Sequence, residues 1–142
     1  MRWLVAPLLA LAPAGAPYAA WAQTAVDTMP ERVVSQAYDA FNRRDPAAFL
    51  SFFAPVWYYA ALEDTAAGPR RHVREDDIRD YTERGAFRTT PTIKVTRRIV
   101  IGPYVVDEQA RGRDGTVVLD IFEVRQGKIV REWESGPITK AP

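Results

Sequence analysis

The hydrophobic pattern of this chain changes once, from helical spacing in the first half to strand-like runs in the second. Between Pro30 and Asn42, apolar side chains recur at the spacing that puts them on one face of an α-helix. Between Ile93 and Glu134, apolar and β-branched runs are separated by short turns that contain glycine. This order predicts an α+β fold, in which helices cover one face of a curved antiparallel sheet.

Local signals predict the ends of the first two helices. The first helix begins at Pro30 and ends in the polar residues 42–44. Asp45 can accept the free backbone N–H groups of the second helix, and Pro46 suits its first position. Pro55 is expected to end this second helix.

A strand and a third helix are expected to follow. The aromatic run 56–62 favours a strand, and residues 63–71 a loop or short hairpin. The acidic residues 75–77 complement the dipole of a third helix, which is expected to include Phe87.

The composition excludes several classes of function. The chain has 142 residues, 47% of them hydrophobic, with 19 basic and 18 acidic side chains, one histidine and no cysteine. This length fits one domain, and the balanced charge gives no field that would attract nucleic acid or an anionic membrane. Without cysteine there is no disulfide or thiolate site, and a lone histidine excludes a multi-histidine metal site within one chain. We therefore expect neither a metal nor a cofactor.

Residues 1–22 have the parts of a secretory signal peptide: a positive charge at Arg2, a short apolar run and the small-residue ending Ala20–Ala22. A membrane anchor is the alternative, but prolines interrupt the run and it falls short of the ~20 apolar residues that span a bilayer. Cleavage after Ala22 predicts a mature chain without net charge in a bacterial periplasm or outside the cell. The rest is expected to comprise a loose lead-in (23–29), one domain (30–136) and a C-terminal tail (137–142).

The turn at residues 125–127 decides the register of the last hairpin. A two-residue type I′ turn would put Gln126 at positive φ, whereas a three-residue turn with a bulge requires this only of Gly127. Glycine adopts that conformation freely, so the three-residue turn is favoured.

This register predicts which side chains share a face. It pairs Asp120 with Glu132, and a slip of one residue would reverse both faces. The predicted pairs on the Asp120 face also include Val118 with Glu134 and Phe122 with Val130. The opposite face pairs Leu119 with Trp133 and Ile121 with Arg131.

The face with Leu119, Ile121 and Trp133 is apolar and needs cover. A second copy of the chain is the simplest cover, because two-fold dimers are the commonest oligomers. The alternative is that the chain's own tail, including Ile138, covers it.

Two separated motifs resemble the SnoaL-like, or nuclear transport factor 2-like, superfamily. The first comprises Tyr38–Phe49 with Phe52–Pro55, and the second is the closing hairpin Asp120–Glu134. The resemblance extends over Val33–Glu134 and implies a cone-shaped bent sheet wrapped around three helices, with an apolar pocket at its open end. Members include ketosteroid isomerase, polyketide cyclases, limonene epoxide hydrolase, dehydratases and many non-catalytic binding or dimerisation domains. The family therefore implies a pocket and leaves the reaction open.

Ketosteroid isomerase has three catalytic groups, and the resemblance implies a counterpart in this sequence for one of them. Asp120 falls where that enzyme has a protonated aspartate in its oxyanion hole. The position of its general base holds Ala61, and that of its oxyanion tyrosine holds Ala37. Tyr38 is adjacent, but one residue turns a helical side chain by about 100°, so it is not a simple substitute.

Asp120 lies in an otherwise apolar strand, where burial would raise its pKa and a nearby Glu132 would raise one of the two pKa values further. A neutral carboxyl beside a carboxylate is a workable acid–base pair. The alternative is a carboxylate that is solvated or paired with Arg111 or Arg131.

Other side chains are candidates for the pocket. By resemblance and strand period, Trp57 and Tyr59 point into it, and Tyr59 could donate a hydrogen bond to a ligand. Gln109 could reach it from its strand. His72 stands among arginines and is expected on an exposed loop, with a base at the pocket rim as the alternative. The complete predicted pocket set is Trp57, Tyr59, Ala61, Gln109, Val118, Phe122, Glu132 and Glu134, around Asp120.

Three functions follow. The first is an exported domain that binds a small apolar or polycyclic molecule. The second is a cofactor-independent isomerase, dehydratase or hydrolase that uses Asp120, and more weakly Tyr59, as acid or base. The third is a non-catalytic dimerisation or interaction module whose aromatic side chains fill the cavity.

Overall fold

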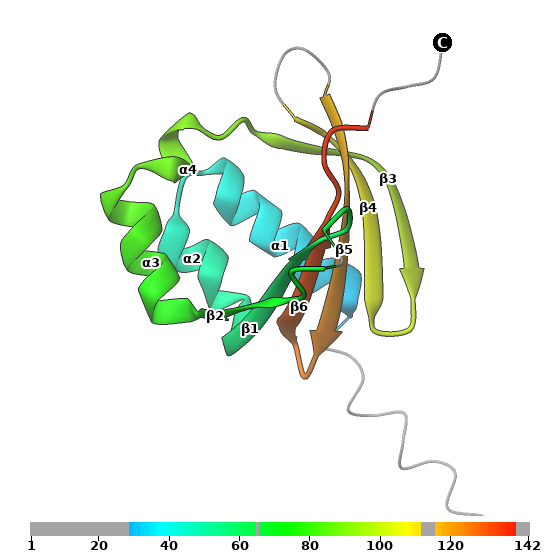
Figure 1. The fold of residues 1–142 in the computed structure, drawn as a ribbon, viewed down its shortest axis with the longest axis horizontal. Helices are drawn as coiled ribbons and strands as arrows, with labels where there is room; N and C mark the ends of the chain where they lie inside the picture. The colour runs from blue at the N-terminus through cyan, green and yellow to red at the C-terminus, as the bar shows by residue number, and fades with distance from the viewer. Residues whose placement is uncertain (1–28, 65, 112–115, 139–142) are drawn as a thin grey trace, which may run out of the picture.

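The computed structural model describes residues 29–138, except residue 65 and residues 112–115. The predicted signal peptide, nearly all of the lead-in, most of the tail and the turn at 112–115 therefore lie outside the described residues. Figure 1 shows a bent sheet with the helices gathered on one side of it.

The first two helices form as predicted. Helix α1 spans Pro30–Asn42 and buries its apolar stripe, and α2 spans Pro46–Ser51. The carboxylate of Asp45 accepts the backbone N–H of Ala48 at 2.9 Å, which confirms the N-cap. Helix α2 ends before Pro55 because the chain already pairs as strand β1, Phe53–Ala61, with Phe53 opposite Ile129.

The third predicted helix is present, and a fourth, short helix corrects the expectation of three. Helix α3 spans Arg74–Glu83, and α4 spans Ala86–Thr89. Gly85, at φ 67°, separates them. Phe87 therefore belongs to α4, where its ring packs 4.6 Å from that of Phe41.

Six strands form one sheet in the order β2-β1-β6-β5-β4-β3. The predicted curved antiparallel sheet is present, and among its neighbouring strands β1 and β6 alone are parallel in the described residues. Strand β2 begins in the expected loop or hairpin, residues 63–71, and extends two residues beyond it. The remaining bounds are Arg70–Val73 for β2, Ile93–Ile101 for β3, Tyr104–Arg111 for β4, Thr116–Arg125 for β5 and Lys128–Glu134 for β6.

The last hairpin closes with the turn that the sequence analysis disfavoured. Arg125 pairs with Lys128 across a two-residue turn, with Gln126 at φ 50° and Gly127 at φ 71°. A bulge lies in β6, where Val130 is the additional residue between the pairs Val124–Ile129 and Glu123–Arg131.

The register is consequently shifted by two residues from the predicted one. Asp120 pairs with Glu134, Phe122 with Glu132, and Ile121 with Trp133. Because side chains alternate with period 2, this shift leaves Asp120, Glu132 and Glu134 on their predicted face. The predicted pair of Phe122 with Val130 is wrong: before the bulge it is Ile129 that pairs with Val124 and is buried in the core. The three carboxyl groups of Asp120, Glu132 and Glu134 therefore share one side of the sheet.

The core lies between α1, α2 and this side of the sheet. It is apolar and well buried, and it leaves a hollow toward α3 and α4. The buried cluster comprises Val33, Val34, Ala37, Tyr38, Leu50, Phe53, Trp57, Val105, Phe122, Val124 and Ile129. Within the described residues, none of the helices has the length and apolar character required to cross a membrane.

Candidate functional site

A cavity of about 300 Å³ opens between the helices and the inner side of the sheet. Aromatic rings form most of its lining, with polar groups concentrated on the strands. Its lining residues are Tyr38, Phe41, Phe49, Trp57, Tyr59, Arg70, His72, Tyr81, Phe87, Thr90, Ile93, Arg111, Asp120, Phe122, Glu132 and Glu134. A concave cavity rich in aromatic side chains, with a few convergent polar groups, is typical of a small-molecule site.

Asp120 is the most deeply buried acid of this cavity, with 1% of its surface exposed. Its Oδ2 accepts hydrogen bonds from the side-chain amide of Gln109 and from Arg111, the latter at 3.0 Å. Its Oδ1 is buried and has no hydrogen-bond partner among the described residues. When the carboxyl group is protonated, Oδ2 is already taken by two donors, so the proton belongs on Oδ1.

Burial raises the pKa of Asp120 to about 7 from its ordinary value of 3.8. Arg111 opposes this rise and the charge of Glu134 adds to it. Burial also raises the pKa of Glu132 well above its usual range, and the charges of Asp120 and Glu134 raise it further. The predicted raised pKa values thus have burial as their main cause, and with a pKa of about 7 Asp120 holds a proton for part of the time at neutral pH.

A hydrogen-bond chain connects Asp120 to helix α1. The amide nitrogen of Gln109 donates to the hydroxyl oxygen of Tyr38 as well as to Asp120. The amide oxygen of Gln109 accepts from Arg111 at 3.2 Å, which fixes the orientation of the amide. Burial raises the pKa of the Tyr38 hydroxyl well above its usual range, and the charge of Asp120 raises it further.

Tyr38 therefore enters the site, although its position on the helix argued against this. The residue before it, Ala37, is buried in the core, and the longer side chain of Tyr38 reaches the cavity. The side chain of Gln109 supports this network from behind the lining, where it is fully buried.

The three carboxylates have oxygen atoms within 4.8 Å of one another, a spacing that could hold a metal ion. Carboxylate oxygens suit magnesium, calcium and manganese. The same nitrogen of Arg111, Nη2, lies 3.0 Å from both Asp120 Oδ2 and Glu134 Oε2. A metal ion would therefore have to displace a guanidinium group that already neutralises the cluster.

On another side of the cavity, His72 forms a pair with Asp77. Its Nδ1 lies 3.0 Å from Asp77 Oδ1, and Asp77 Oδ2 accepts from the indole nitrogen of Trp57 at 2.9 Å. The imidazole stacks on the Trp57 ring at 4.4 Å with an interplanar angle of 30°. The prediction of an exposed loop residue is thus wrong: His72 lies on β2, and β1 and α3 hold its ring at the cavity.

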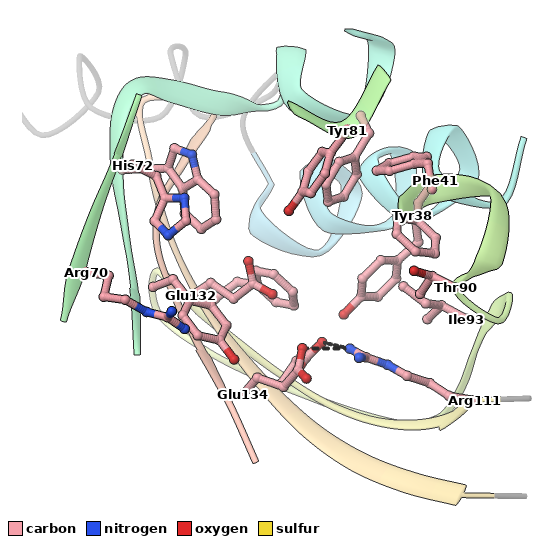
Figure 2. Close-up of a pocket in the computed structure, with 16 residues that line it drawn as sticks. Tyr38, Phe41, Arg70, His72, Tyr81, Thr90, Ile93, Arg111, Glu132 and Glu134 are labelled. Carbon is pink, nitrogen blue, oxygen red and sulfur yellow. Dashed lines mark hydrogen bonds and ion pairs between the residues drawn. The ribbon is translucent and has the colours of Figure 1, made fainter. Parts of the chain in front are cut away.

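Tyr59 and Arg70 lie next to this pair. The guanidinium of Arg70 lies 5.1 Å from the centre of the Tyr59 ring, within cation–π distance. Burial raises the pKa of Tyr59, and the charges of Glu134 and Glu132 raise it further. Figure 2 shows Arg70 and His72 on one side of the cavity and Arg111 on the other, with Glu132 between them.

The structure brings together most of the predicted pocket residues. Trp57, Tyr59, Phe122, Glu132 and Glu134 line the cavity with Asp120. The other predicted residues are placed differently: Val118 is buried beside Gln109 in the sheet, and Ala61 lines two separate hollows with Gly68. The cavity thus contains an acid, Asp120, and a histidine that can accept a proton, among many aromatic side chains.

Comparison with known proteins identifies the fold and the domain type. Residues 34–132 match the SnoaL-like domain. No curated protein matches the chain in sequence.

Solved structures share the fold at low sequence identity. A putative ketosteroid isomerase from Kribbella flavida is similar, with a TM-score of 0.59 and 20% identity over 80% of this chain and 81% of that chain. An NTF2-like protein of unknown function from Burkholderia xenovorans has a TM-score of 0.59 and 18% identity, over 80% and 87%. An NTF2-like protein from Burkholderia thailandensis has a TM-score of 0.53 and 23% identity, over 74% and 88%. These likenesses support the cone-shaped α+β fold.

Proposed function

Since the chain belongs to the SnoaL-like domain family, we propose that it binds a small, largely apolar ring compound whose oxygen atom accepts a hydrogen bond from Asp120. The match to the SnoaL-like domain and the fold shared with the putative ketosteroid isomerase both support the binding of a small ligand.

The observation that carries this proposal is Oδ1 of Asp120, which is buried and has no hydrogen-bond partner among the described residues. A buried polar atom without a partner is unfavourable by about 1–3 kcal/mol, and a ligand oxygen would relieve that deficit. With its pKa at about 7, the acid holds a proton for part of the time at neutral pH and can donate it to a carbonyl or hydroxyl oxygen.

The size and lining of the cavity narrow the ligand class. About 300 Å³ is at the lower end of the range for ligand pockets, which favours one or two fused rings over a steroid. Aromatic side chains such as Phe41, Phe49 and Tyr81 provide faces and edges against which such rings pack. The same volume argues against an interaction module whose aromatic side chains fill the cavity.

Ligand binding can be tested by thermal shift, because a ligand that binds only the folded state raises Tm. The matched probes are 2-tetralone, a bicyclic aromatic ketone, and tetralin, which lacks the oxygen. We expect 2-tetralone to bind about tenfold more tightly than tetralin, the equivalent of one hydrogen bond. Asp120→Asn keeps a donor at this position and retains binding, whereas Asp120→Leu weakens it about tenfold. Equal affinity for both probes, or no shift with either, would contradict the proposal.

A second candidate function is cofactor-independent acid–base catalysis. It is favoured by a specific observation: an acid with a pKa of about 7, at Asp120, faces the same cavity as the His72–Asp77 pair. It requires the same ligand-binding cavity.

We propose that the protein acts in the periplasm or outside the cell, after removal of residues 1–22. The charged start, apolar run and Ala20–Ala22 ending support this. Mass spectrometry of the protein recovered from a periplasmic extract should give a chain that begins at Gln23. A chain that retains Met1 would contradict export by a cleaved signal.

We also propose a homodimer that forms through the outer side of the sheet. Four apolar residues form one row across four strands of this side: Ile99 opposite Val106, Val106 opposite Ile121, and Ile121 opposite Trp133. Ile99 is 43% exposed. Of the described tail residues, Ile138 pairs with Val117 at the margin of this region and is itself 44% exposed.

A further inference from the structure

Two groups suited to proton transfer face the cavity from different strands. Asp120 lies on β5 and His72 on β2. In the sheet order these strands are three places apart, which is about 14 Å between backbones at ordinary strand spacing. Both side chains line the same cavity of about 300 Å³, the volume from which the ligand class of one or two fused rings was proposed.

The hydrogen bonds of the His72–Asp77 pair specify its protonation. A carboxylate only accepts hydrogen bonds, so the hydrogen on the His72 ring belongs on Nδ1, which faces Asp77 at 3.0 Å. Nε2 then carries the free lone pair and is directed away from Asp77. This is the tautomer that a general base requires.

The pair is also held in one orientation. Asp77 is anchored by the Trp57 indole through its second oxygen, and the imidazole rests on the face of that same indole. A base that is oriented by a hydrogen-bonded carboxylate is the arrangement seen in catalytic triads and similar sites. The His72 side chain is 27% exposed, so its proton can exchange with solvent.

We propose that His72 is a catalytic base, positioned by Asp77, that removes a proton from a carbon next to the carbonyl group of a ligand held by Asp120. This assignment rests on the proposed ligand-binding function and adds to it a reaction class, proton transfer at the α-carbon of a cyclic ketone.

The step balances without a cofactor. The His72 Nε2 lone pair takes the proton, and the C–H electron pair becomes the new carbon–carbon double bond. The carbonyl π pair moves to oxygen, which takes the proton of Asp120 and forms an enol. In the reverse step the His72 imidazolium returns a proton to carbon, at the same or a conjugated position, and Asp120 recovers its proton from the enol oxygen.

The test measures deuterium incorporation into 2-tetralone in D2O, by NMR, together with the affinity for this ketone. Wild-type protein should accelerate exchange at the carbons next to the carbonyl. His72→Gln should lower the exchange rate constant at saturating ketone by about 10²-fold or more, with Kd changed less than threefold. Arg71→Gln, an exposed neighbour on the same strand, is the matched control and should retain full exchange.

Asp77→Asn separates positioning from general structural support. An amide nitrogen at this site donates to Nδ1 and shifts the ring hydrogen to Nε2, so exchange should fall at least tenfold while the affinity for 2-tetralone is retained. A variant that loses affinity together with exchange would make the pair a binding element and overturn the base assignment.

The two proposals can fail separately. If wild-type protein binds 2-tetralone but exchanges no proton, or if His72→Gln exchanges as fast as wild type, the catalytic assignment is overturned and the binding function stands. If 2-tetralone does not bind, the proposed ligand class is wrong and the catalytic assignment falls with it.

Discussion

Arg111 Nη2 lies 3.0 Å from Asp120 Oδ2, and yet the pKa of Asp120 is raised to about 7. Burial outweighs the attraction of the guanidinium, and the same nitrogen also lies 3.0 Å from Glu134. One positive charge is therefore shared between two carboxylates. The consequence is an acid that retains its proton in a cavity suited to apolar ligands.

The raised pKa of Asp120 predicts that stability depends on pH. Between the ordinary pKa of 3.8 and about 7, the folded protein keeps a proton that the unfolded chain has lost. The free energy of unfolding contributed by this group therefore falls as pH rises through that window. Urea unfolding at pH 5 and at pH 8 measures the fall in the free energy of unfolding between the two pH values. This fall should be about 2 kcal/mol smaller in Asp120→Asn than in wild type. An identical drop in both proteins would show that Asp120 has an ordinary pKa.

Tyr38→Phe should destabilise the fold by about 1–3 kcal/mol, because it removes the oxygen that accepts from the buried amide of Gln109. Urea denaturation measures the change. Tyr58→Phe is the matched control: its side chain lies on the outer side of β1 and is 37% exposed, so the change should stay within about 0.5 kcal/mol. Equal effects of the two changes would argue against the Tyr38–Gln109 hydrogen bond.

Gln126→Asn should stabilise the last hairpin by about 1 kcal/mol. Gln126 occupies the first central position of a two-residue turn at φ 50°, which asparagine adopts more readily than glutamine. Gly127→Ala should have the opposite effect, since glycine at φ 71° has no Cβ to strain. Thermal unfolding measures both, and a destabilising Gln126→Asn change would contradict the two-residue turn.

Ile121→Asp should convert the proposed dimer to a monomer. The change places a charge in the middle of the apolar row on the outer side of the sheet, next to Trp133 and Val106. Light scattering coupled to size exclusion should give twice the chain mass for wild type and one chain mass for the variant. A monomeric wild type would refute the dimer.

The features that the sequence predicted well depend on local or periodic signals. The Asp45 cap and the stripe of α1 are specified within one or two helical turns. The face of Asp120 was predicted correctly although the register was not. The turn is one residue shorter than expected, and the bulge adds one residue to β6. The register beyond the bulge is therefore shifted by two residues, which keeps the side chain of Glu134 on the same face as Asp120.

The features that the sequence analysis missed depend on contacts between distant residues. Strand β2 has four residues and is defined by pairing with β1, and Tyr38 meets Gln109 across 71 positions of the chain. The His72–Asp77 pair had a signal that could have been used. A strand that ends at Val73, directly before a helix with acidic residues in its first turn, brings a carboxylate back toward the strand.

The proposed hydrogen bond from Asp120 to a ligand depends on the protonation state of this carboxyl group, and the side-chain carboxyl carbon reports that state directly. A ¹³C NMR titration of the protein, with Asp120→Asn used to assign the signal, should give a midpoint near 7. A midpoint near the ordinary value of 3.8 would mean that the group is a permanently charged partner of Arg111, and would contradict its role as a hydrogen-bond donor to a ligand.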